Sequence, residues 1–175
     1  VGTLEPRKNL GTLLRAFRLV KSRSDYDLKL VIVGGKGWLF KNIFQIIKGL
    51  GLENDVIFTG FVPDEDLPSL YRGAEVFVYP SLYEGFGLPL LEAMTCGTPV
   101  IASKHSSIPE VVGNAGILVD PKDVERLARA ILEVLTNKHL KDELIYKGCL
   151  QASKFTAEKM GHEIIRVYKE IAGRS

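Results

Sequence analysis

Residues 80–93 have the sequence PSLYEGFGLPLLEA, a glycine-rich turn that leads from an apolar stretch into a helix-forming one. Two glycines flank Phe86, and glycine lets the backbone come close to a ligand. Pro89 suits the first turn of a helix, so a helix is expected to begin near Gly87 or Leu88. The free N–H groups and the dipole of a helix start bind anions, and a diphosphate is a natural ligand there. This stretch predicts a strand, a tight turn and a helix that bind phosphate.

Two carboxylates bracket the turn: Glu84 precedes it, and Glu92 lies about one turn into the expected helix. A carboxylate as far along the helix as Glu92 cannot usefully face a phosphate. It can accept hydrogen bonds from paired hydroxyls, such as those of a ribose. Glu84 is expected to face the other way, toward a group attached to the diphosphate. The pair therefore predicts a nucleoside diphosphate that carries a further substituent.

Outside this turn, strand-sized apolar runs alternate with amphipathic helices, and helices alone follow Pro121. This order predicts one α/β domain over residues 1–175: a doubly wound, Rossmann-like parallel sheet of about six strands, helices on both faces and a helical C-terminal tail. Ligands of such sheets bind outside the carboxyl ends of the strands. The expected strands are residues 1–4, 28–33, 56–59, 75–79, 100–103 and 117–119, and the helices between them are residues 9–21, 39–50, 64–72 and 88–96.

Composition excludes several classes of protein. The 175 residues are 46% hydrophobic and 25% charged, which rules out general disorder. The net charge of +2 lacks the basic excess of a nucleic-acid or membrane-surface binder. No apolar run is long enough to span a membrane. Cys96 and Cys149 cannot form a disulfide framework, so reduced thiols and a cytoplasmic location are predicted.

Residues 84–92, EGFGLPLLE, match the E-x7-E signature of retaining glycosyltransferase family 4, the group of glycogen synthase and many mannosyltransferases. Residues 2–9, GTLEPRKN, resemble the first donor-domain loop of that family. The resemblance continues in order over nearly the whole chain, through residues 30–35, 56–62, 97–103 and 116–119. It implies the C-terminal, nucleotide-sugar-binding half of a two-domain GT-B enzyme, with the N-terminal acceptor-binding half missing.

The resemblance also implies roles for individual residues. Glu92 would hold the ribose and Glu84 the donor hexose, while Arg7 and Lys8 would neutralise the diphosphate. Many relatives carry Arg at the place of Thr3; the arrangement here is associated with mannosyl- and rhamnosyltransferase-like members. Catalytic roles are expected for Glu84, Arg7 and Lys8, and nucleotide-sugar contacts for Glu92, Gly85, Phe86, Gly87, Leu88, Gly2, Thr3, Gly35, Phe61 and Val62, with Lys36 a further neighbour of the nucleotide.

No resident cofactor and no metal are expected. The D-x-D triplets at residues 25–27 and 64–66 are explained by a turn and by a helix start, and the glycines at residues 34–37 fail the G-x-G-x-x-G pattern. The expected partners are a nucleotide sugar, GDP-mannose or a UDP- or ADP-hexose, and the missing half of the chain, through which alone a membrane would be contacted. A non-catalytic nucleotide-sugar-binding module, a nucleotide-sugar epimerase and an NAD-linked dehydrogenase remain alternatives. The sequence does not choose the base, the sugar or the acceptor.

Overall fold

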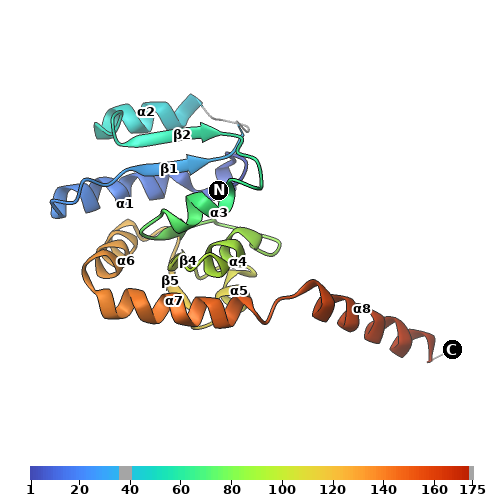
Figure 1. Ribbon diagram of the computed structural model, residues 1–175. Helices are drawn as coiled ribbons and strands as arrows, with labels where there is room; N and C mark the ends of the chain where they lie inside the picture. The colour runs from blue at the N-terminus through green and yellow to red at the C-terminus, as the bar shows by residue number, and fades with distance from the viewer. Residues whose placement is uncertain (36–40, 174–175) are drawn as a thin grey trace.

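A computed structural model describes residues 1–35 and 41–173 of the chain. Parallel strands and helices alternate through the first two thirds, and helices alone follow (Figure 1). The strands are β1 (Leu30–Val33), β2 (Val56–Gly60), β3 (Phe77–Tyr79), β4 (Val100–Ser103) and β5 (Gly116–Val119). The helices are the 3-10 turn η1 (Pro6–Lys8), α1 (Leu10–Arg23), α2 (Lys41–Leu50), α3 (Leu67–Arg72), α4 (Leu88–Thr95), α5 (Ile108–Val112), α6 (Val124–Thr136), α7 (Lys138–Ala152) and α8 (Ala157–Ala172).

The strands form two parallel sheets, β1–β2 and β3–β4–β5. The predicted α/β class is confirmed, but the described residues hold five strands in two sheets where about six in one sheet were expected. The difference lies at residues 1–4, where only Leu4 makes a bridge. The N–H of Gly2 bonds to the carbonyl of Val33 at 2.9 Å, and that of Leu4 to Gly35 at 3.1 Å. The backbone of residues 1–4 therefore pairs with the carboxyl end of β1, while the Val1 side chain packs against the buried cluster of the larger sheet.

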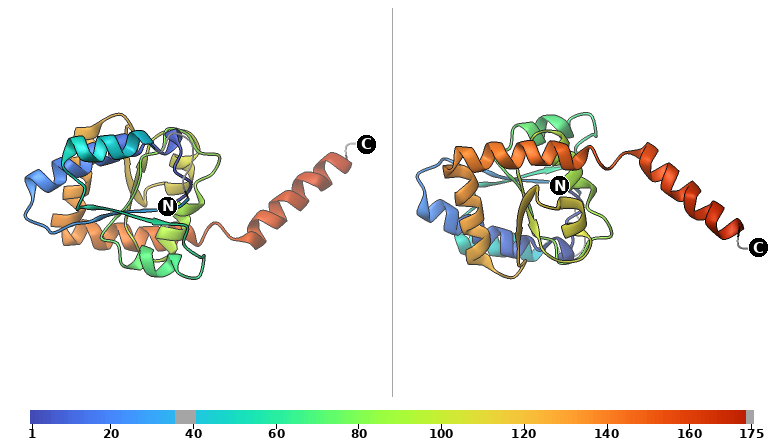
Figure 2. Two further views of the ribbon diagram at one scale, coloured as in Figure 1. Left: turned by 90° about the horizontal axis from the view of Figure 1, so that it is seen from above. Right: turned by 90° about the horizontal axis from the view of Figure 1, so that it is seen from below.

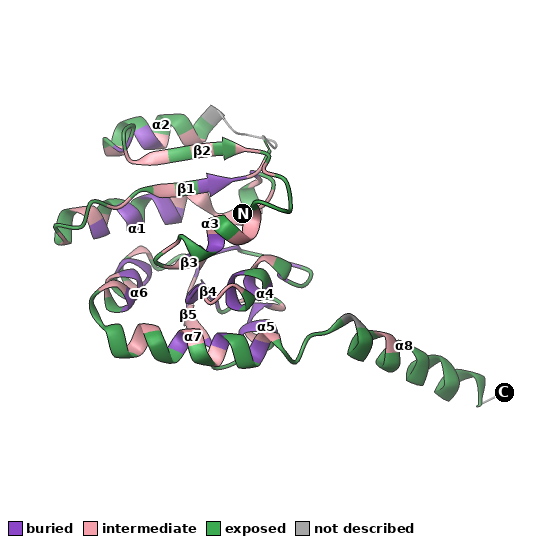
Figure 3. Ribbon diagram, in the orientation of Figure 1, coloured by how far each residue is buried: buried purple, intermediate pink, exposed green. Residues whose placement is uncertain are grey.

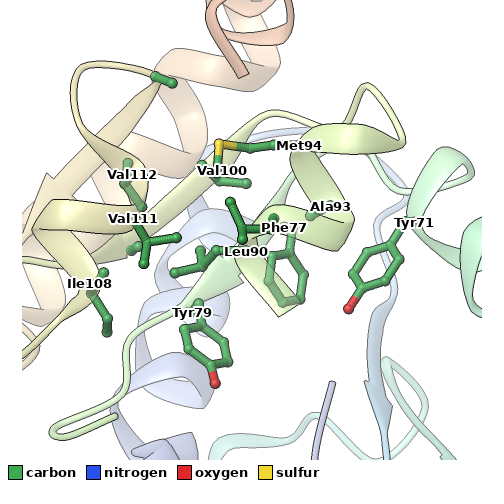
Figure 4. Close-up of a cluster of buried hydrophobic side chains, with 13 residues drawn as sticks. Tyr71, Phe77, Tyr79, Leu90, Ala93, Met94, Val100, Ile108, Val111 and Val112 are labelled. Carbon is green, nitrogen blue, oxygen red and sulfur yellow. The ribbon is translucent and has the colours of Figure 1, made fainter. Parts of the chain in front are cut away.

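Helices cover both faces of the larger sheet. Ile101 of β4 lies in a buried cluster with residues of α1 and α6, whereas Val100 and Ala102 lie in a cluster with residues of α3, α4 and α5. Because successive side chains of a strand point to opposite faces, these are two separate cores. Figure 4 shows the second core, with the rings of Tyr71 and Tyr79 inside it and their hydroxyls at its margin.

The C-terminal helix α8 projects away from the domain (Figures 1 and 2). Its apolar side chains are exposed: Met160 by 62%, Tyr168 by 70% and Ile171 by 63%. The expected helical tail is present, but it does not pack on the domain. None of the helices in the described residues combines the length and the apolar character of a membrane span.

Candidate functional site at the carboxyl ends of the strands

Loops that follow β1, β2 and β3 converge on the first loop of the chain. The Leu82 N–H donates to the carbonyl of Arg7 at 2.7 Å, and the Asn9 side-chain amide donates to the carbonyls of Pro80 at 3.1 Å and Pro121 at 2.6 Å. The Gly34 N–H donates to the carbonyl of Gly60 at 2.8 Å. Four predicted binding loops are thus tied together by direct hydrogen bonds.

The backbone of the first loop and the backbone at the end of β1 lie so close together that side chains are excluded between them. Gly34 has φ +137°, and a Cβ there would lie 2.1 Å from the Gly2 carbonyl oxygen, so no other residue fits. Gly2 has φ +118°, and its own Cβ would meet the Lys8 Nζ at 3.3 Å. Gly35, exposed, accepts the Leu4 hydrogen bond, whereas the expected neighbour Lys36 lies outside the described residues.

The glycine-rich turn leads into α4 as predicted, with Gly87 at the N-cap position and Leu88 as the first helical residue. Gly87 has φ +105°, which favours glycine, and a Cβ there would crowd Leu90 at 3.2 Å. Gly85 has open space around it and no such requirement. The first turn of α4 contains no acidic side chain, so its free N–H groups remain suited to an anion.

The three predicted catalytic residues form one ionic cluster. The Glu84 carboxylate is buried and accepts hydrogen bonds from Arg7 Nη1 at 2.5 Å and from Lys8 Nζ at 2.7 Å. Lys8 Nζ also donates to the Tyr79 hydroxyl at 2.6 Å and lies 4.7 Å from the centre of its ring. Arg7 Nε pairs with Glu5 at 2.6 Å. Two cations and two carboxylates thus balance each other.

The cluster keeps Glu84 ionised. Burial alone would raise the pKa of the Glu84 carboxyl, but the hydrogen bonds from Lys8 and Tyr79 and the Lys8 charge outweigh it and hold that pKa below its ordinary 4.5. Burial and the neighbouring Glu84 charge raise the pKa of Tyr79, which therefore stays a neutral phenol. The Ser81 hydroxyl beside this region is buried and has no hydrogen-bond partner among the described residues.

Glu92 lies apart from the ionic cluster, exposed on α4, and accepts a 2.7 Å hydrogen bond from the Tyr71 hydroxyl. Tyr71 is buried, and its carbonyl accepts a 2.6 Å bond from the Thr98 hydroxyl. Burial and the hydrogen bond to Glu92 raise the pKa of Tyr71. A fixed phenol therefore holds one Glu92 oxygen and leaves the other for a ligand.

The remaining predicted contacts lie at the surface of these loops. Thr3 is exposed, Leu88 is 60% exposed, and Phe61, directly after the Gly60 turn, is 80% exposed. Phe86 is 44% exposed and packs edge-on against Phe155 at 5.9 Å between ring centres. Val62 is half-buried. An exposed aromatic ring such as that of Phe61 suits a stacked base.

Sequence reasoning missed two serines that hold the glycine-rich turn. Ser106 Oγ donates to the Glu84 carbonyl at 2.6 Å and accepts from the Glu84 N–H at 3.3 Å. Ser107 Oγ contacts the same carbonyl at 2.9 Å and the Phe86 carbonyl at 3.1 Å. Ser106 has φ +60°, uncommon outside glycine. The only sequence signal was their position after β4, at the ligand-binding edge.

Across residues 1–35 and 41–173, no group of three or more His, Cys, Asp and Glu side chains could hold a metal ion. The helix start predicted at Asp64 is not observed, because α3 begins at Leu67, and Asp66 at its N-cap position makes no side-chain capping bond. Cys96 and Cys149 are free, and Cys149 is exposed.

Comparison with known protein families gives one match, to the model described as Glycosyl transferases group 1, over residues 1–151. The O-antigen chain mannosyltransferase B of Escherichia coli is 43% identical over 169 residues, which are 97% of this chain and 44% of that protein. The chain thus spans less than half the length of the curated relatives it matches.

Solved structures share the fold. A sucrose-phosphate synthase from Thermosynechococcus elongatus superposes with a TM-score of 0.85 at 29% identity, over 99% of this chain and 45% of that one. The Anabaena protein HepE in complex with UDP-glucose superposes with a TM-score of 0.84 at 26% identity, over 97% of this chain and 48% of that one.

Proposed function

The chain belongs to the group 1 glycosyl transferases, and on that premise we propose that it is the donor-binding domain of a retaining hexosyltransferase that uses a nucleoside diphosphate sugar. The observation that carries the proposal is the ionic cluster of Arg7, Lys8 and Glu84 beside the start of α4. Positive charge and free N–H groups at one place suit a diphosphate.

The two cations have different freedom. The Arg7 side chain is 41% exposed, whereas that of Lys8 is 11% exposed and held by Glu84 and Tyr79. Arg7 can turn from Glu5 toward an incoming phosphate, and Lys8 acts as a fixed charge beneath it. As the bond from sugar to diphosphate breaks, negative charge grows on the leaving group, and preorganised cations and N–H groups stabilise that charge.

The two glutamates divide the donor between them. Glu92 accepts hydrogen bonds from the ribose hydroxyls with the oxygen that Tyr71 leaves free. Phe61 borders the base, with Val62 and Gly35 beside it. Glu84 positions the hexose on the other side of the glycine-rich turn, where the backbone of residues 85–88 meets the diphosphate.

The acceptor side belongs to chain outside this domain. The O-antigen chain mannosyltransferase B of Escherichia coli is more than twice as long as the segment that this chain matches, which leaves room for an acceptor-binding half. Its description as a mannosyltransferase, together with the Arg7-Lys8 form of the first loop, favours GDP-mannose as donor. Metal independence and a cytoplasmic location stay predictions.

The test is a calorimetric titration of this chain with GDP, UDP and ADP and with their hexose conjugates, in EDTA. We expect one nucleotide family to bind with a micromolar to millimolar Kd, about −4 to −8 kcal/mol. Arg7→Ala should weaken that binding about tenfold. The matched control is Arg129→Ala, which removes an exposed arginine from α6.

Absence of binding by every nucleotide, with the chain folded, would refute donor binding by this domain. A strict need for Mg²⁺ or Mn²⁺ would overturn metal independence. Failure of the full-length enzyme to transfer a sugar, despite nucleotide binding, would favour the non-catalytic binding module.

A further inference from the structure

Two buried phenols stand in one row of aromatic rings (Figure 4). Phe77 and Tyr79 lie two positions apart on β3, so their side chains share one face of the sheet, and their ring centres are 5.8 Å apart. Tyr71 of α3 packs edge-on against Phe77 at 5.3 Å between ring centres. All three side chains are buried. Close packing therefore fixes the places of both phenol hydroxyls at the margin of the core.

The Tyr79 hydroxyl occupies one of the three donor directions of Lys8. Lys8 Nζ donates to that hydroxyl at 2.6 Å and to Glu84 Oε1 at 2.7 Å, and the Lys8 side chain is nearly buried. An ammonium group has three N–H donors. Among the described residues the third N–H has no hydrogen-bond partner. The two bonds that are made set the direction of this third N–H.

The same hydroxyl also meets Glu84. Because the Tyr79 oxygen accepts from Lys8, its own proton is left to donate, and the Glu84 carboxylate is the acceptor. Burial and the Glu84 charge raise the pKa of Tyr79, so the phenol keeps this proton. One hydroxyl thus ties the cation and the carboxylate of the site together. Without it, Lys8 could turn about its single remaining hydrogen bond to Glu84.

Tyr71 is the counterpart of Tyr79 at the other glutamate. Its hydroxyl donates to Glu92 Oε2 at 2.7 Å, and no hydrogen bond within the described part of the chain joins that hydroxyl to the ionic cluster. The two phenols are equally buried, at 3% exposure each, and both pack on Phe77. They differ in what their hydroxyls hold, which makes one the matched control for the other.

We propose that Tyr79 is a positioning residue for the diphosphate: its hydroxyl holds Lys8 so that the third N–H of the ammonium points at the leaving group. The inference rests on the proposed function and adds a division of labour within the buried core. Tyr79 sets the affinity for the phosphates through Lys8, and Tyr71 sets the affinity for the ribose through Glu92. Glu84→Gln does not remove this hold, because the amide still offers Lys8 an oxygen.

The test compares Tyr79→Phe with Tyr71→Phe, since each keeps its ring in the aromatic row and loses only a hydroxyl. Both variants and wild type are titrated in EDTA with GDP and GMP, UDP and UMP, and ADP and AMP. Tyr79→Phe should weaken binding of the diphosphate about tenfold and binding of the monophosphate less than about twofold. Tyr71→Phe should weaken both by the same factor, about three- to tenfold, and should not affect binding of the 2′,3′-dideoxy diphosphate. A general loss of folded protein would lower all these affinities equally.

A further variant shows whether Tyr79 acts through Lys8. Lys8→Met should lose the same preference for diphosphate over monophosphate, and adding Tyr79→Phe to it should change that preference no further. Equal losses for diphosphate and monophosphate in Tyr79→Phe, an unchanged preference in Lys8→Met, or a further loss in the double variant would overturn the inference. In each of these cases wild type still binds nucleotide, so the proposed function stands. If wild type binds none of the six nucleotides, the proposed function fails and the inference fails with it.

Discussion

The two sheets are built from the same kinds of residue but reach different degrees of burial. In β4, Val100, Ile101 and Ala102 are fully buried, whereas in the smaller sheet the paired residues Val31 and Ile57 are 44% and 46% exposed (Figure 3). β4 has a strand on each side and helices on both faces. The β1–β2 sheet packs α1 and α2 on one face only. The burial of a strand thus depends on its neighbours more than on its own residues.

Matched truncations in the two sheets should show the largest effect. Ile101→Ala opens a cavity in a closed core and should lower the free energy of unfolding by about 3–5 kcal/mol. Ile57→Ala removes a half-exposed side chain and should cost about 1 kcal/mol or less. Urea unfolding at neutral pH measures both. Equal losses would contradict the contrast between the two sheets.

The ionic cluster joins the two regions, because Arg7 and Lys8 follow the segment that pairs with β1 while Glu84 and Tyr79 belong to the β3 side. Glu84→Gln leaves Lys8 nearly buried without its counter-charge. The variant should lose about 2–3 kcal/mol of stability at pH 7. The matched control is Glu92→Gln, at an exposed carboxylate outside the cluster, which should leave the free energy of unfolding almost unchanged. A similar loss in both variants would show that the cluster does not join the two regions.

The same carboxyl predicts a pH dependence. The folded-state pKa of Glu84 lies below its ordinary 4.5, so its contribution is fully present above that value and is lost as pH falls through the lower folded-state pKa. Wild type should therefore lose stability more steeply than Glu84→Gln as pH falls below about 4.5. Unfolding midpoints measured from pH 6 to pH 3 test this, and parallel curves would contradict it.

Nucleotide binding should separate the two glutamates. Glu92→Gln weakens a charge-assisted acceptor and should lower affinity for the nucleotide and its sugar conjugate alike, by about 10- to 30-fold. Glu84→Gln removes the carboxylate that pairs with Arg7 and Lys8 and should leave the affinity for the bare nucleotide nearly unchanged. It should reduce the extra affinity that the attached sugar adds. Four dissociation constants decide the matter. If Glu84→Gln weakens bare nucleotide as much as Glu92→Gln does, the division of roles is wrong.

The sequence predicts the features that depend on neighbouring residues along the chain better than those that depend on distant partners. The turn at Gly87 and the helix from Leu88 depend on local glycine and proline chemistry, and they were predicted correctly. The strand at residues 1–4 needs a partner along its length, which no local pattern reports. The apolar stripe of α8 shows that the helix is amphipathic but not what it contacts. α5 has five residues, too few for a periodic signal.

Side chains that connect regions were the hardest to predict. Tyr71 and Tyr79 belong to the buried core by position, and they reach the site through their hydroxyls and, for Tyr79, through the ring face beside Lys8 (Figure 4). Ser106 and Ser107 act through the backbone carbonyls of another loop, a contact that residue type alone does not report. These partners are 21 to 71 residues apart in sequence, so only the folded chain brings them together.

The smallest expected effect concerns these serines, which fasten the glycine-rich turn of the larger sheet. Ser107→Ala removes one hydroxyl shared by two carbonyls, and Ser106→Ala removes the bond to the Glu84 N–H, so each should cost about 1 kcal/mol or less of stability. Stability loss alone would not show that the serines position the turn. We therefore also expect Ser106→Ala to speed amide exchange at Glu84 and to reduce the extra affinity that the attached sugar adds to nucleotide binding. Ser107→Thr keeps the hydroxyl and should restore what Ser107→Ala loses. The control is Ser22→Ala, on the exposed end of α1, which should leave Glu84 exchange unchanged. If wild type binds nucleotide and Ser106→Ala changes neither the amide exchange at Glu84 nor the extra affinity for the sugar conjugate, the serines do not position the turn. The turn would then keep its conformation without these hydroxyls.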